Sequence, residues 1–211
     1  MNTLLDEAAA AAAVNEEQNA VIGDGKEEKD KDNNDIPAGS RPVKTLPRPV
    51  YDGDPRALID MCRWNGLGNC DEVRDLIARG ININKQDEDG QTALNFAAIY
   101  GRTDIVRELI GAGAALDVQD GDQCTALIWA VANGHTDIAR ELIRAGAALD
   151  VQDEDQQTAL ILAAKYGHTD IVRELIRAGA SLDVQDEEQH TALICAANNG
   201  HAEIVALLEN A

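Results

Sequence analysis

Aromatic side chains are scarce in this sequence. They account for 3% of its 211 residues, whereas apolar residues account for 45%. With so few large rings, a core must be built from Ala, Leu, Ile and Val, which favours closely packed helices over a sandwich rich in Trp and Tyr. The apolar fraction is enough for one sizeable core.

Basic residues are also few, with 18 Lys and Arg against 38 Asp and Glu and a formal charge of −20. Such a surface repels nucleic acid and anionic membranes and attracts basic partners. No apolar run of about 18 residues occurs, so no bilayer span is expected. The N-terminus lacks the positive start of a secretory signal and the arginines of a transit peptide. We therefore expect a cytoplasmic protein.

No cysteine pair with C-x-x-C spacing occurs; Cys62, Cys70, Cys124 and Cys195 stand singly. In a reducing compartment such residues act as small buried hydrophobes, with metal binding as the second alternative. The sequence places no base beside Cys124 or Cys195, so a catalytic thiol is not expected. Nucleophile elbows, phosphate loops and dinucleotide fingerprints are also missing. The sequence predicts no enzyme and no cofactor.

Residues 1–53 differ in composition from residues 54–211. They hold an alanine run, a charged stretch and most of the prolines. This part offers little to bury and is predicted to be a disordered acidic segment followed by a linker. From residue 54 the sequence repeats every 33 residues, in units at 54–86, 87–119, 120–152, 153–185 and 186–211. A fixed period of this length is typical of a stacked solenoid.

Each unit predicts two short helices. In the 87–119 unit, apolar residues at helical spacing begin near Leu94, and Gly101 ends this first helix. Thr103 suits the N-cap of a second helix with Leu109 in its apolar stripe, and Gly113 fits the left-handed position that closes it. Neither helix can bury its apolar face alone, so the units must stack into an all-α domain.

Two motifs recur in register. Thr-Ala-Leu-x-x-Ala occurs at 92–97, 125–130, 158–163 and 191–196, and Gly-His occurs at 134–135, 167–168 and 200–201. With the leucine-rich second helix they resemble the ankyrin repeat. The resemblance implies a solenoid of five stacked helix-turn-helix units with β-turn fingers, the first of them divergent, with extra residues near Leu67-Gly68. It also implies a protein-binding function.

The sequence departs from the ankyrin pattern at three places. The family's histidine is replaced by Asn95, Ile128, Ile161 and Ile194, so stacking is expected to depend more on apolar contacts. The proline of the family's first helix is replaced by alanine in the four regular units. The finger glycine remains at Gly90 but becomes Gln123, Gln156 and Gln189 in the later units, so strained turns are expected there.

The recurring histidines His135, His168 and His201 invite a metal hypothesis. The resemblance implies instead that each caps a second helix and bonds to nearby backbone. Neighbouring units hold such side chains roughly 8–10 Å apart, too far to share one ion. His190 is expected to be an exposed finger residue. The acidic turns lack the ligand spacing of an EF-hand loop, so no metal site is predicted.

The resemblance places the finger tips and the inner ends of the first helices on the concave binding face. The predicted partner-binding residues are Asp89, Gln91, Ile99, Tyr100, Asp122, Cys124, Asn133, Asp155, Gln157, Lys165, Tyr166, Glu188, His190, Asn198 and Asn199. Trp129 lies one helical turn before Asn133 and is expected in the core, because a large indole usually buries.

The fingers carry fourteen carboxylates, and no Lys or Arg occurs in 86–98, 115–125, 148–158 or 181–191. Stacking is expected to align them into an acidic ridge beside Tyr100 and Tyr166. We predict a monomeric interaction scaffold that binds a basic protein partner on this face. The alternatives are a regulatory or targeting arm of a larger protein and a microbial effector that mimics host repeats. An acidic edge that serves only solubility also stays open.

Overall fold

In the computed structural model, residues 56–63 and 70–211 are described. The predicted disordered segment at 1–53 and the extra residues near Leu67-Gly68 lie outside the described residues. Within the described ranges the chain forms ten helices and no strand, which confirms the all-α prediction. None of these helices has the length and apolar character needed to cross a membrane.

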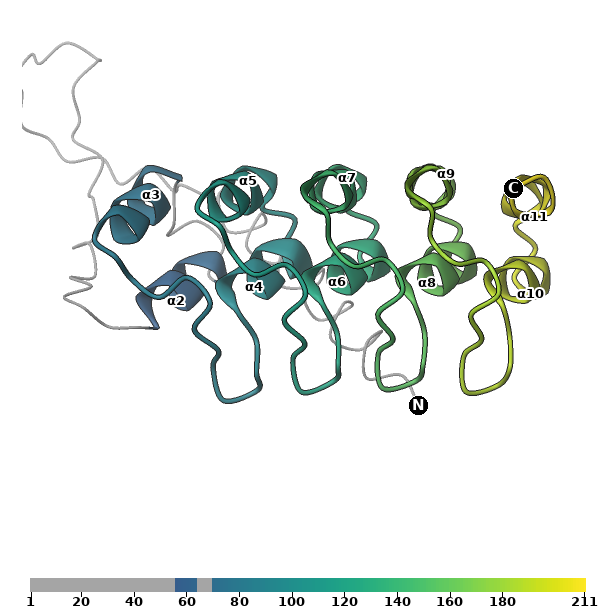
Figure 1. Ribbon diagram of the computed structural model, residues 1–211, viewed down its shortest axis with the longest axis horizontal. Coiled ribbons are helices and arrows are strands. Elements are labelled where there is room, and N and C mark those ends of the chain that lie inside the picture. Colours follow the sequence, from purple (N-terminus) through teal and green to yellow (C-terminus); the bar gives the residue numbers. More distant parts are fainter. Residues whose placement is uncertain (1–55, 64–69) are drawn as a thin grey trace, which may run out of the picture.

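The helices form two parallel rows (Figure 1). The inner row consists of the first helices of the units: α2 (Ala57–Arg63), α4 (Ala93–Ile99), α6 (Ala126–Ala132), α8 (Ala159–Tyr166) and α10 (Ala192–Asn198). The outer row consists of the second helices: α3 (Cys70–Ala78), α5 (Thr103–Gly111), α7 (Thr136–Ala145), α9 (Thr169–Ala178) and α11 (Ala202–Glu209). Between a second helix and the next first helix, the chain makes a long finger that projects beyond the inner row (Figure 1).

The inner helices begin at their threonines. Thr92, Thr125, Thr158 and Thr191 are extended N-cap residues, and each side-chain oxygen accepts a backbone N–H three residues later. Such a cap satisfies one of the free donors at a helix start and is typically worth about 1 kcal/mol. The repeated Thr-Ala-Leu motif therefore fixes where each finger ends and each inner helix begins.

The outer helices begin differently from the prediction. Thr103 is the first residue of α5; its N-cap is Arg102, which makes no side-chain capping bond. His135 and His201 occupy N-cap positions without capping as well. Their rings reach back to the preceding unit, where His135 Nε2 lies 3.1 Å from Ile99 O and His201 Nε2 lies 3.2 Å from Lys165 O. For His135 and His201 the predicted backbone contact is confirmed, but it joins two units instead of capping one helix.

Gly134 shows why glycine precedes these histidines. Its φ is +68°, a left-handed conformation that glycine adopts without steric cost. A Cβ there would also lie 2.9 Å from Cε1 of His168, in the next unit. The close approach of one unit's turn to the next unit's imidazole therefore requires a residue with no side chain.

The core runs continuously through the stack between the two rows of helices. Leu109, Leu142 and Leu175 of the outer row have 0% exposure, and Ile128 and Ile161 of the inner row have 1%. Alanines of the inner helices, such as Ala97, Ala130 and Ala163, are fully buried in this core, as the shortage of aromatic residues predicts. Every unit therefore depends on its neighbours for burial.

Candidate partner-binding surface

Each finger is organised by a buried or half-buried aspartate at its base. In the 153–185 unit, Asp153 Oδ1 accepts the backbone N–H groups of Asp155 and Gln157 at 3.1 and 2.7 Å. Asp87, Asp120 and Asp186 make the equivalent pair of bonds. Between these two donors the backbone takes a positive φ, which is +58° at Gln156. The strain predicted from the missing glycines is therefore present, with the aspartate bonds holding the turn.

The four described fingers are also bonded to one another through their backbones. The N–H groups of Gly121, Glu154 and Glu187 donate to the carbonyls of Asp89, Asp122 and Asp155, at 2.8, 3.1 and 3.2 Å. Glutamine side chains add a second set of links: Gln119 Nε2 donates to Gln123 O at 2.8 Å and to Gln152 O of the next finger at 3.3 Å. The finger tips therefore form a fixed row (Figure 1).

Most predicted partner-binding residues lie on the accessible surface. Asp89, Glu188, Asn198 and Asn199 are exposed. A larger group is half-buried, with part of each side chain accessible: Gln91, Ile99, Tyr100, Asp122, Asn133, Asp155, Lys165, Tyr166 and His190.

Two predicted residues do not reach that surface. Cys124 has 0% exposure, and its thiol lies 3.6 Å from the carbonyl of Asp122, so it packs inside the finger. Gln157 is 7% exposed, and its Oε1 accepts a hydrogen bond from Lys165 Nζ at 3.2 Å. Both occupy the position that Gln91 and His190 hold in other units, where the side chain is half-buried. The repeat position alone therefore does not predict exposure.

The predicted acidic ridge carries less exposed charge than its fourteen carboxylates suggest. Asp120, Asp153 and Asp186 are buried and hold the turns, so they add little to an outer ridge. At the first finger, Arg56 Nη2 lies 2.8 Å from Glu88 Oε1 and neutralises part of its charge. That arginine lies immediately before α2, outside the finger sequences.

The second carboxylate oxygen, Oδ2, has different surroundings in Asp120, Asp153 and Asp186. Trp129 is in the core as predicted, with 1% exposure, and its Nε1 donates to Asp120 Oδ2 at 2.6 Å. Leu162 occupies that place beside Asp153, whose Oδ2 is buried without a hydrogen-bond partner in the described part of the chain. Burial raises the pKa of the Asp153 carboxyl to about 6, and burial also raises the pKa of Asp120.

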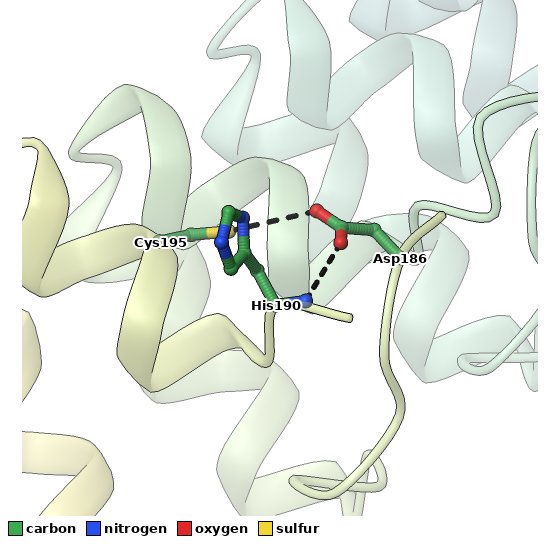
Figure 2. A group of neighbouring side chains, drawn as sticks. All are labelled: Asp186, His190 and Cys195. Atoms are coloured by element: carbon green, nitrogen blue, oxygen red, sulfur yellow. Dashed lines mark hydrogen bonds between the residues drawn. The ribbon is translucent and has the colours of Figure 1, made fainter. Parts of the chain in front are cut away.

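In the last unit the same place holds Cys195, next to His190 (Figure 2). One potential ligand atom from each of Asp186, His190 and Cys195 lies within 4.8 Å of the other two. Burial raises the pKa of the Cys195 thiol to about 11, helped by the charge of Asp186. Sequence reasoning treats His190 and Cys195 separately and misses this cluster. The available signal is their offset of four and nine residues from the basal aspartate.

The outer row balances its own charges. Arg140 bonds to Asp137 at 2.9 Å within its own helix and to Glu174 of the next helix at 3.2 Å. The same pattern recurs at Arg74, Arg107 and Arg173. Acidic charge without such an internal match is therefore concentrated on the fingers.

Two rows of helices with bonded fingers define a solenoid of stacked helix-pair repeats. A family model described as ankyrin repeats (3 copies) matches residues 58–153 and 139–211. The chain therefore belongs to the ankyrin repeat family, as its motifs predicted. A search of curated proteins finds no match. Ankyrin repeats generally mediate protein–protein interaction, and their fold is typically a non-enzymatic interaction scaffold.

Proposed function

We propose that this protein is an interaction scaffold without catalysis of its own, which binds a protein segment bearing Lys or Arg along its fingers. The contact surface consists of an acidic ridge and the adjacent inner-helix ends. We define the acidic ridge as the exposed and half-buried carboxylates of the finger tips: Glu88, Asp89, Asp122, Glu154, Asp155, Glu187 and Glu188. The observation that carries the proposal is the set of backbone bonds between successive fingers, which aligns in one row the turns that carry these carboxylates.

A fixed row of like charges favours a basic partner for two reasons. The backbone of the fingers does not have to be ordered on binding, so less conformational entropy is lost than with flexible loops. Their combined field also attracts and orients a cationic segment before contact. Arg74, Arg107, Arg140 and Arg173 of the outer helices are engaged with acids of the same row of helices and do not cancel this field locally.

An apolar anchor is available beside the ridge. Tyr166 is half-buried at the end of α8, and the charges of Asp153 and Asp155, after burial, contribute to raising its pKa. Tyr100 holds the equivalent place in the 87–119 unit and stacks on Phe96 at 6.4 Å between ring centroids. Aromatic side chains held in this way are frequent centres of binding energy at protein interfaces.

The experiment compares two faces of the protein at equal charge. Partners are captured from a lysate on the full-length chain and identified by mass spectrometry. The association rate of the purified partner is then measured at several salt concentrations, with a chelator present. The test variant replaces Asp89, Asp122 and Asp155 with Asn. The matched control replaces Asp104, Asp137 and Asp170, on the outer helices, with Asn.

The ridge variant is expected to slow association at low salt by roughly tenfold or more, with less effect as added salt screens the field. The control should slow it much less. Equal slowing by both variants would mean that only net charge matters, and no slowing by either would leave the ridge as a solubilising edge. Monomeric state and cytoplasmic location stay predictions from the sequence.

A further inference from the structure

We propose that Asp186, His190 and Cys195 bind a divalent transition-metal ion, zinc in particular, at the base of the last finger (Figure 2). This proposal does not rest on the proposed partner binding, although His190 and the neighbouring Glu188 also belong to the predicted partner-binding surface. The site arises from three residues that the finger turn and the first turns of α10 bring together.

The distances between the three ligand atoms suit a small tetrahedral ion if the side chains move slightly closer together. Zinc binds cysteine sulfur at about 2.3 Å and histidine nitrogen or carboxylate oxygen at about 2.0–2.2 Å, which places neighbouring ligand atoms about 3.5 Å apart. Cys195 Sγ and Asp186 Oδ2 are 3.9 Å apart, and all three ligand atoms lie within 4.8 Å of one another. Coordination therefore requires side-chain movements of about 1 Å, without refolding of the backbone.

Two of the three ligands are already held in place. Asp186 Oδ1 accepts the backbone N–H groups of Glu188 and His190 at 3.0 and 2.8 Å, while its Oδ2 faces Cys195 (Figure 2). Cys195 lies on α10 with 5% exposure. The main adjustment is in the His190 side chain, which is 33% exposed and has Glu188 Oε2 3.3 Å from its Nδ1. Glu188 adds a second acidic group that favours a cation at this place.

Comparison of the described fingers shows what is particular to the last one. The aspartate and its two backbone bonds recur in all four, but the residues four and nine positions later change. They are Gln91 and Phe96, Cys124 and Trp129, Gln157 and Leu162, and finally His190 and Cys195. Of these fingers, only the last combines carboxylate, imidazole and thiol. If His190 and Cys195 varied independently, nothing would require their ligand atoms to lie close to each other and to the Asp186 carboxylate.

The ligand chemistry selects the class of ion. Thiolate and imidazole suit zinc and related transition ions, whereas calcium and magnesium take oxygen ligands. Three protein ligands leave a fourth tetrahedral position for water or for a group from another molecule. His190 is partly exposed, so the cluster can be reached from the finger surface.

The test uses cobalt(II) as a spectroscopic probe for the zinc site in the full-length, reduced chain. We expect one ion per chain, a thiolate-to-cobalt charge-transfer band, and loss of that band when zinc is added. His190→Gln and Cys195→Leu install the residues that the 153–185 unit carries at the same places, so both variants suit the fold, which circular dichroism checks. Cys124→Ala is the control for a buried cysteine outside the site.

Cys195→Leu should abolish the band, and His190→Gln should weaken cobalt affinity by at least the roughly 10–100-fold that loss of an outer-shell partner costs. Cys124→Ala should leave both unchanged. A wild-type chain without a saturable charge-transfer band, or a band that survives in Cys195→Leu, would overturn the proposal. Binding of cobalt with equal affinity by the wild type and both site variants would likewise assign the ion to the acidic surface.

Discussion

At the residue scale, one carboxylate oxygen of the basal aspartate makes the same hydrogen bonds in every described finger, whereas the surroundings of the other oxygen differ between units. Its Oδ1 always accepts two turn N–H groups, so the residue cannot be lost without releasing the turn. Its Oδ2 meets the Trp129 indole in one unit, no partner in the next, and the Cys195 thiol in the last. Because burying an unmatched charge is unfavourable, the middle case has the largest consequence for stability.

Asp153 should therefore make folding depend on pH. Its pKa is about 6 in the folded chain against an ordinary value of 3.8, so the fold favours the protonated form. The resulting stabilisation is complete below about pH 4 and is lost as the pH rises through about 6. Asp153→Asn keeps Oδ1 and stays neutral. Its free energy of unfolding relative to the wild type should rise by about 1–3 kcal/mol between about pH 4 and pH 7.

Urea unfolding at several pH values measures this difference. Asp89→Asn is the control, since it removes an exposed carboxylate from the equivalent place in another finger and leaves the surroundings of Asp153 unchanged. A relative stability of Asp153→Asn that stays constant over this pH range, or that follows the control, would contradict a buried unpartnered carboxylate.

At the element scale, each helix is stabilised mainly by its neighbours in the stack. The outer helices are short, at most ten residues, and such segments are marginal in isolation. Their leucines fill the space between rows, and their arginines bond to glutamates of the next outer helix. Exposed ion pairs contribute little, typically below about 1 kcal/mol each, so the buried leucines should dominate the stability of each helix.

Leu142→Ala, in the middle of α7, should lower the free energy of unfolding by about 2–5 kcal/mol, through lost burial and the cavity left behind. The side chain has 0% exposure. Chemical unfolding followed by circular dichroism gives the value. Leu207→Ala on α11 is the comparison, because that leucine is half-buried and its loss should cost clearly less. A cost below about 1 kcal/mol at Leu142 would mean that the buried stripe is not where the structure has it.

The sequence predicted the helices and their order because helix starts and burial are local or periodic signals. The Thr-Ala-Leu motif carries its own cap, and Leu142 belongs to a repeated apolar stripe. Contacts between units are not local and were missed. The ring of His135 bonds to the preceding unit instead of capping α7, and Cys124 is covered within the stack instead of lining the surface. The cluster of Asp186, His190 and Cys195 was missed for the same reason, because these side chains come together only through the path of the finger backbone.

At the scale of the whole molecule, the environment of a residue depends on its unit's place in the stack. Ile128 and Ile161 occupy equivalent inner-helix positions and have 1% exposure. Ile194 occupies the same position in α10 and has 38% exposure. In the described chain α10 is the last helix of the inner row, so no further inner helix covers this side chain. Identical residues in a repeated sequence can therefore contribute very different amounts to stability.

Substitution of both isoleucines with glutamine tests this dependence on position. Ile161→Gln buries an amide where the structure offers apolar neighbours, and it should cost about 3–5 kcal/mol from lost apolar burial and an unmatched polar group. Ile194→Gln can keep its amide in water, and its effect should stay within about 1 kcal/mol. Urea unfolding of the full chain measures the loss of stability in both variants. The slope of the unfolding free energy against urea concentration shows whether the stack still unfolds as one unit. Similar losses at the two positions would mean that Ile194 is covered in solution by another part of the chain or by a second molecule.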